Sequence, residues 1–165
     1  VRRLLDVTRR PQLNQEAIPL KELVEDLQKL WTPTLTAHRV RLELDAPENC
    51  VLFVDRKQME QLFINLVNNA VDAMPDGGLI QLHAEPEGEG WALALTDQGH
   101  GIAPEHLGKI FKPMFTTKPE GKGTGLGLPI CREIVRSHGG EIRAESQPGA
   151  GTTLHFHLPG FQRAA

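Results

Sequence analysis

Apolar residues recur at helical spacing in three segments of the chain. The first segment, residues 20–31, places six apolar side chains on one helical face: Leu20, Leu23, Val24, Leu27, Leu30 and Trp31. The second begins at Asp55, which is placed to cap it, runs to about Met74 and stops at the PDGG sequence of residues 75–78. The third covers residues 128–138 and ends at a glycine pair, the usual place of a C-cap. The pattern predicts three main helices.

Between and after these helices, short runs rich in β-formers or with alternating apolar residues predict about six strands. The predicted strands are residues 40–44, 51–54, 79–84, 91–96, 141–146 and 152–158. Helices and hairpins are interleaved along the chain. This order predicts an α/β fold, a two-layer sandwich with a mixed, mostly antiparallel sheet and about three helices packed on one face.

The two ends of the chain differ from this folded unit. Residues 1–10 are basic and apolar in a helix-compatible order, and Pro11 stops them. We therefore assign residues 1–18 to the end of a helix and a linker, residues 19–160 to one domain, and residues 161–165 to a tail. Because the chain begins at Val1, we expect it to be part of a longer protein.

Composition excludes several classes of partner. A net charge of −3 with 18 basic residues shows no bias toward nucleic acid. No apolar run approaches the roughly 20 residues that span a bilayer, so we expect no membrane contact by this domain, although the whole protein could still be anchored. Cys50 and Cys131 fit no metal-binding spacing. We expect them to be buried and reduced, in a cytoplasmic protein.

The helix after Asp55 has an unusual polar face. Six side chains fall within an arc of roughly 100° at 3.6 residues per turn: Gln58, Gln61, Asn65, Asn68, Asn69 and Asp72. A solvated face is normally built from Glu, Lys and Arg, whereas three asparagines within five residues are costly in a helix interior. An amide oxygen can bind Mg²⁺, and its NH₂ group can donate to phosphate. The face is therefore a candidate ligand site.

Two glycine clusters add to this candidate. Residues 97–102, DQGHGI, follow a predicted strand, so that Asp97 can accept a hydrogen bond from a ligand amine above Gly99 and Gly101, although such a turn is often only a tight turn. Residues 121–127, GKGTGLG, lead directly into the third helix. Free backbone N–H groups and the helix dipole make this start suitable for phosphate. No GxxxxGK[ST] sequence of a P-loop is present.

The segment between the clusters, residues 110–118, has the sequence IFKPMFTTK. Phe111 and Phe115 either anchor this loop to the core or serve an interaction. Lys118 and Lys122 are either solvated or reach a terminal phosphate. We interpret His100, inside the first cluster, as a loop residue rather than a catalyst.

Taken in order, four motifs resemble the N, first-glycine, F and second-glycine boxes of sensor histidine kinases, which have a GHKL or Bergerat ATPase fold. The motifs are NLVNNA at 65–70, DQGHG at 97–101, FKPMF at 111–115 and GTGLGL at 123–128. The resemblance covers about residues 20–159. Two further segments, AMPDGG at 73–78 and FTTK at 115–118, look most like the subgroup that includes nitrogen-regulation sensors.

The resemblance implies a role for each motif. Asn69 would bind the Mg²⁺ that bridges the phosphates of ATP, with Asn65 near the γ-phosphate, and ADP would be the product. Asp97 would accept from the adenine amine, and Gly99, Gly101 and Ile102 would shape its pocket. The second-glycine box would line the phosphates: Gly123, Thr124, Gly125, Leu126, Gly127 and Leu128. Many relatives carry a basic residue where Asp72 stands, and the lysines, above all Lys118, would compensate.

The resemblance implies a kinase that transfers phosphate to a histidine on a separate dimerisation domain and serves a response regulator receiver domain. Residues 1–10 resemble the end of that dimerisation hairpin, and without it we expect the fragment to be monomeric. One alternative is another GHKL ATPase. Its hydrolysing members usually place a glutamate where Asn65 stands, and Asn65 is a poor base. The other alternative is a non-catalytic adaptor that only docks a response regulator.

Overall fold

The computed structural model describes residues 12–161 except 122 and 124. Within these residues the chain forms seven strands and four helices. The strands are β1 Gln15–Pro19, β2 Val40–Asp45, β3 Val51–Asp55, β4 Gly78–Glu87, β5 Gly90–Asp97, β6 Ile142–Ser146 and β7 Thr152–Pro159. The helices are α1 Leu20–Ala37, α2 Arg56–Asp72, α3 Pro104–Leu107 and α4 Gly127–Ser137.

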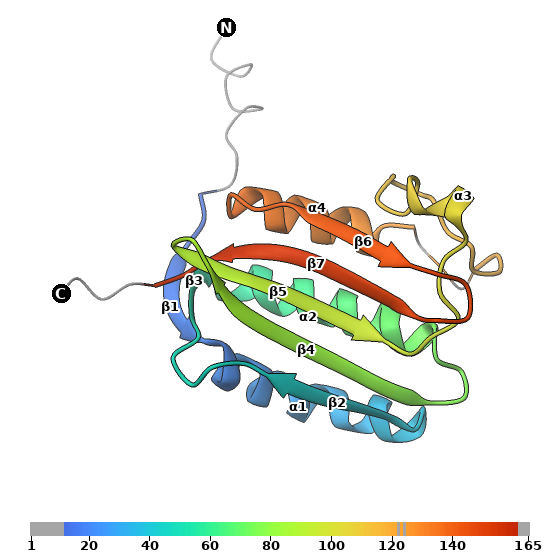
Figure 1. The fold of residues 1–165 in the computed structure, drawn as a ribbon, viewed down its shortest axis with the longest axis horizontal. Coiled ribbons are helices and arrows are strands. Elements are labelled where there is room, and N and C mark those ends of the chain that lie inside the picture. The colour runs from blue at the N-terminus through green and yellow to red at the C-terminus, as the bar shows by residue number, and fades with distance from the viewer. Residues whose placement is uncertain (1–11, 122, 124, 162–165) are drawn as a thin grey trace, which may run out of the picture.

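Five strands form the main sheet in the order β2-β4-β5-β7-β6. The pair β2–β4 is parallel and the other three pairs are antiparallel. Helices α1, α2 and α4 lie along one face of this sheet (Figure 1). The two-layer α/β sandwich with a mixed, mostly antiparallel sheet is therefore confirmed.

The core fills the space between the sheet and the three long helices. Side chains of strand β7 alternate between the core and the other face of the sheet. Leu154, Phe156 and Leu158 are buried, whereas the neighbouring Thr153 and His155 are only partly buried. From the helix layer, α2 contributes a continuous apolar stripe that includes Phe63, whose ring meets that of Phe156 edge-on at 6.1 Å. This packing fixes α2 behind the middle of the sheet and leaves its polar face for other contacts.

Helix α1 is longer than predicted. The apolar period placed its end at Trp31, but the helix continues to Ala37 with Pro33 inside it. Proline has no N–H to donate within the helix, but Pro33 is exposed, so water can reach the carbonyl that is left without this donor. The buried Leu35 packs the last turn of the helix against the core. Leu30 was assigned to the apolar face and is instead 66% exposed, because it lies at the edge of the stripe.

The predicted linker contains a strand. Residues Gln15–Pro19 form β1, which pairs antiparallel with β3 in a separate two-stranded sheet at one end of the domain. Phe161, assigned to the tail, donates its N–H to the Val51 carbonyl at 3.0 Å. The pattern missed both because they are short and paired with a segment more than thirty positions away. The predicted helix end at residues 1–10 and tail residues 162–165 lie outside the described residues.

The long loop is mostly irregular, as predicted. The loop predicted between residues 97 and 127 holds one short helix, α3, which Pro104 begins. None of the described helices is both long and apolar enough to cross a bilayer.

Both cysteines are buried and neither forms a disulfide. Burial raises the pKa of the Cys50 thiol and of the Cys131 thiol to about 12. Since the thiolate is the reactive form, we expect neither thiol to react with a disulfide reagent in the native protein at pH 7. Counting thiols colorimetrically before and after denaturation checks this: two should appear only after unfolding, and reaction of either thiol in native protein would contradict the prediction.

Candidate functional site

A cavity of about 600 Å³ lies beside the sheet, between α2 and the segment that joins β5 to α4. Five sequence-distant parts of the chain line it: the polar face of α2, the first-glycine segment, α3 with the loop after it, the start of α4, and the first residue of β7. Eleven predicted site residues line it: Asn65, Asn69, Asp72, Asp97, Gly101, Ile102, Lys118, Gly123, Gly125, Gly127 and Leu128. The fold thus brings nearly the whole predicted set to one place.

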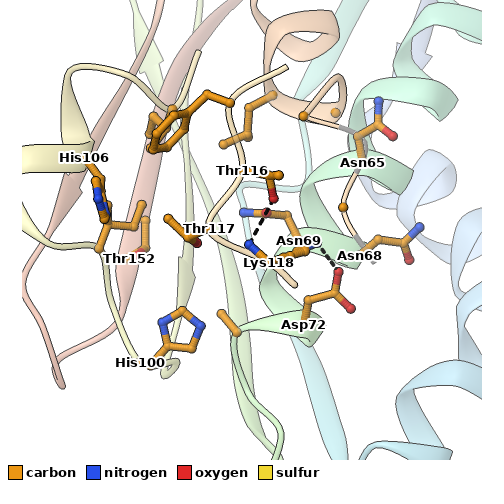
Figure 2. Close-up of a pocket in the computed structure, with 18 of the residues that line it drawn as sticks. Asn65, Asn68, Asn69, Asp72, His100, His106, Thr116, Thr117, Lys118 and Thr152 are labelled. Atoms are coloured by element: carbon orange, nitrogen blue, oxygen red, sulfur yellow. Dashed lines mark hydrogen bonds and ion pairs between the residues drawn. The ribbon is translucent and has the colours of Figure 1, made fainter. Parts of the chain in front are cut away.

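Helix α2 supplies one wall of the cavity. Asn65, Asn68, Asn69 and Asp72 of this helix line the cavity, and Asn69 and Asp72 lie beside the loop that carries Thr116 and Lys118 (Figure 2). The helix is capped by Asp55, whose side chain accepts from the Gln58 N–H at 3.2 Å, as its position predicted. Because the opposite face is anchored in the core, the amides are held on a rigid element.

Asp97 is the buried carboxylate of the cavity, with 5% of its surface exposed. Its Oδ1 accepts from the Gly99 N–H at 2.8 Å and from the Thr152 N–H at 3.2 Å. Burial raises the pKa of this carboxyl, and the two backbone hydrogen bonds partly oppose that shift. Both described donors use Oδ1, so Oδ2 is the acceptor left for a ligand amine.

The first-glycine segment passes between two backbones. Gly101 has a φ of +74°, and a Cβ there would lie 2.0 Å from the Gln147 carbonyl oxygen, so only glycine fits. Gly99 does not line the cavity. Its missing side chain accommodates Ala73 of the α2 C-terminus instead, at 2.6 Å from a notional Cβ. Close packing against the end of α2 and against the β6–β7 turn therefore requires glycine at these two positions, whether or not a ligand is bound.

The second-glycine segment ends where α4 begins, and Gly127, Leu128 and Pro129 face the cavity. The first N–H groups of a helix have no partner within it, and N-cap Leu126 carries no side-chain acceptor, so this helix start can take an anion. Gly125, at φ +67°, packs on the Met114 backbone. Leu126 does not line the cavity, and Thr124 lies outside the described residues.

The loop that carries the two phenylalanines is held on both sides. Phe111 is partly buried against the core and under the Arg132 guanidinium at 5.9 Å, which supports the anchoring interpretation. Phe115 lines the cavity, and its ring contacts that of His106 at 5.5 Å. Further along this loop, the Lys118 ammonium forms an ion pair with Asp72 across the cavity (Figure 2).

Asn65 sits between the cavity and α4. Its Nδ2 is buried, and its polar neighbour is the Cys131 thiol of α4, whose pKa this amide lowers against the larger effect of burial. A thiol sulfur is only a weak hydrogen-bond acceptor. A ligand oxygen reached by a rotation of this side chain would be a stronger one.

Sequence reasoning missed the cavity residues that come from β7, α3 and the loop after it. They are His106, Ile110, Thr116, Thr117 and Thr152, together with Ala73, Ala103 and Pro129 beside predicted residues. Thr152 is the most informative, since its N–H fixes Asp97 from 55 positions away. The only signal for it was the Pro-Gly turn before the last strand, which says nothing about the neighbouring strand.

The donor set of the cavity fits magnesium held jointly with a ligand. Among the described residues, no group of three or more His, Cys, Asp or Glu side chains could enclose a metal ion. The cavity instead offers amide oxygens from α2. Mg²⁺ usually binds one or two protein oxygens and completes its octahedron with water and substrate phosphate, so Asn69 with a polyphosphate suits it.

A buried carboxylate, an amide-rich helix face and an open helix start around one cavity define a nucleotide-binding domain with an α/β sandwich fold. The sequence profile described as histidine kinase-, DNA gyrase B- and HSP90-like ATPase matches residues 54–162. The chain belongs to this family, as a catalytic domain of the histidine kinase type.

Individual relatives agree with this assignment. Sporulation kinase C of Bacillus subtilis (strain 168) is 34% identical over 142 residues, covering 85% of this chain and 33% of that protein. The sensor histidine kinase ZraS of Escherichia coli (strain K12) is 35% identical, with 96% and 34% covered. The chain therefore spans about a third of these relatives. The resemblance to nitrogen-regulation sensors stays a prediction.

Solved structures show the same fold. The catalytic domain of histidine kinase ThkA superposes with a TM-score of 0.79 at 32% identity, covering 89% of this chain and 96% of that one. ThkA has also been solved in complex with the response regulator protein TrrA. That structure gives a TM-score of 0.77 at 28% identity, with 95% and 45% covered.

Proposed function

We propose that the cavity binds Mg-ATP and that the chain transfers the γ-phosphoryl group of ATP to a histidine on a separate dimerisation domain. The convergence of Asn69, Asp97 and the start of α4 on one cavity carries this proposal. Adenine would lie at Asp97, with its amine donating to Oδ2, and the phosphates would lie between α2 and the first turn of α4. Gly123, Gly125 and Leu128 would contact the phosphate chain.

In the transfer step, an imidazole nitrogen of the acceptor histidine forms a bond to the γ-phosphorus, the bond to the bridging oxygen breaks, and ADP leaves with that electron pair. Bound Mg²⁺ supplies charge neutralisation for the phosphates. The chain itself holds the ligand in place: Asn69 provides an amide oxygen, and the α4 N–H groups donate to phosphate oxygens. Positioning and electrostatics of this kind account for most of phosphoryl-transfer catalysis.

The positions of the acidic side chains in the cavity favour phosphoryl transfer over hydrolysis. Of the described residues that line the cavity, Asp72 and Asp97 are the only two acids. Asp97 would be taken by the adenine amine, and the position that would lie near the γ-phosphate holds Asn65 instead of an acid. The amide of Asn65 cannot take a proton from water. A dedicated carboxylate base for hydrolysis is thus not among these residues.

We further infer that the partners are the dimerisation domain of the same kinase and the receiver domain of a response regulator. The ThkA–TrrA complex supports the second partner, since this chain matches the catalytic part of ThkA. A cytoplasmic location fits the two free cysteines.

Calorimetric titration with ADP and with a non-hydrolysable ATP analogue, each with and without Mg²⁺, tests the binding step. We expect magnesium-dependent binding of both. Mixing the chain with radiolabelled ATP and a helical hairpin that carries an acceptor histidine then tests transfer, with a hairpin lacking that histidine as control. Binding without any transfer would favour the adaptor alternative, and label released only as free phosphate would favour an ATPase.

A further inference from the structure

The cavity contains one cation among its described lining side chains, and that cation is already paired. Lys118 is the only lysine or arginine in this set. Its Nζ contacts Oδ2 of Asp72, the last residue of α2, so the pair joins the loop to the helix across the cavity (Figure 2). A site suited to a polyanion therefore presents little net positive charge at this wall.

Local structure directs the lysine across the cavity. The Lys118 N–H donates to the Thr116 hydroxyl at 3.1 Å, which turns the loop at this point. Gly123 packs on the stem of the lysine, and a Cβ there would lie 3.0 Å from Lys118 Cβ. The ammonium thus reaches α2 one turn beyond Asn69, on the same polar face.

The pair is exposed enough to exchange partners. The Lys118 side chain is 35% exposed and that of Asp72 is 51% exposed, and ion pairs with this much contact to water are weak. A polyphosphate carries several negative charges and makes stronger, charge-assisted hydrogen bonds with an ammonium than one solvated carboxylate does. A phosphate entering beside Asn69 would therefore withdraw the lysine from Asp72.

We propose that Lys118 is a phosphate-binding residue that Asp72 holds in reserve, and that the phosphate chain replaces Asp72 as its partner when nucleotide binds. This inference rests on the proposed Mg-ATP site. Asp72 sets the affinity in this scheme by competing with the nucleotide for the lysine. Asp72 therefore does not contact the phosphate itself; Lys118 makes that contact.

The test measures affinity for the Mg complex of a non-hydrolysable ATP analogue by calorimetry. Asp72→Asn frees the lysine and is expected to tighten binding by up to about fivefold, the range set by exposed ion pairs. Lys118→Gln removes the phosphate contact and is expected to weaken binding about tenfold. Lys118→Arg keeps the charge and should bind within about threefold of the unmodified chain, since an exposed charge contact tolerates either cation.

Asp76→Asn is the matched control, because Asp76 is an exposed acid just beyond α2 that does not line the cavity. It should leave affinity unchanged. Weaker binding by Asp72→Asn would overturn the inference, since Asp72 would then position the lysine instead of competing for it. Unchanged affinity in Lys118→Gln would overturn it as well. If the unmodified chain bound neither ADP nor the analogue, the proposed function itself would be rejected.

Discussion

Asn69→Ala is expected to remove magnesium-dependent binding of ATP. We propose Asn69 as the protein ligand of the ion, so its loss should weaken binding of the Mg-ATP analogue by at least about 100-fold, since even changes to outer-shell partners of a metal cost 10- to 100-fold. The fold should persist, because alanine is a better helix former than asparagine and α2 keeps its buried face. Titration with and without Mg²⁺ measures the effect.

Gln61→Ala is the matched control for this substitution. Gln61 lies on the same polar face of α2 but is exposed and does not line the cavity, so affinity should not change. Magnesium-dependent affinity that survives in Asn69→Ala would refute the ligand assignment. Circular dichroism of both variants shows whether helix content is retained.

Asp97→Asn is expected to weaken binding of the ATP analogue by about 10- to 100-fold, since a hydrogen bond to a charged group contributes about 1.5–3 kcal/mol. The variant amide would place an NH₂ group opposite the adenine amine. We therefore expect a relative gain for inosine triphosphate, whose ring oxygen accepts a hydrogen bond. Asp76→Asn again serves as control, and equal affinity of the Asp97→Asn and unmodified chains for ATP would contradict the adenine assignment.

This substitution should not weaken the fold. Asparagine still offers Oδ1 to the Gly99 and Thr152 N–H groups. Because the pKa of Asp97 is raised in the folded state, the stability contributed by its protonated form is present below the unfolded pKa and lost as pH rises through the folded pKa. The ionised carboxylate thus destabilises the fold at neutral pH, and the melting temperature of Asp97→Asn should equal or exceed that of the unmodified chain.

The same pKa direction predicts how nucleotide affinity varies with pH. The ionised carboxylate is the form that accepts from the adenine amine. Since burial raises its pKa, affinity should fall on acidification at a higher pH than an ordinary aspartate would require. Titrations over a pH series check this, and the Asp97→Asn variant should lack that dependence.

Much of the fold and of the candidate site was predictable because it is written in local patterns. The period of apolar residues in α2 predicted which face of the helix is buried. The three asparagines on the other face are poor helix formers, and they identified that face as a candidate ligand site. The glycine segments marked the strand end at Asp97 and the start of α4. Local spacing is enough for these features since a helix face or a helix start involves neighbours in sequence.

The sequence by itself thus determined the two-layer fold, the polar face of α2 and the order of the glycine segments. Tertiary structure alone decided which distant groups meet. It placed Thr152 on Asp97, because the pairing of β7 with β5 sets a register that no local pattern encodes. It also paired Lys118 with Asp72 and placed Gln15–Pro19, which include the last part of the predicted linker, in strand β1. In each case the energy comes from a contact between segments far apart in the chain, and only the folded packing brings them together.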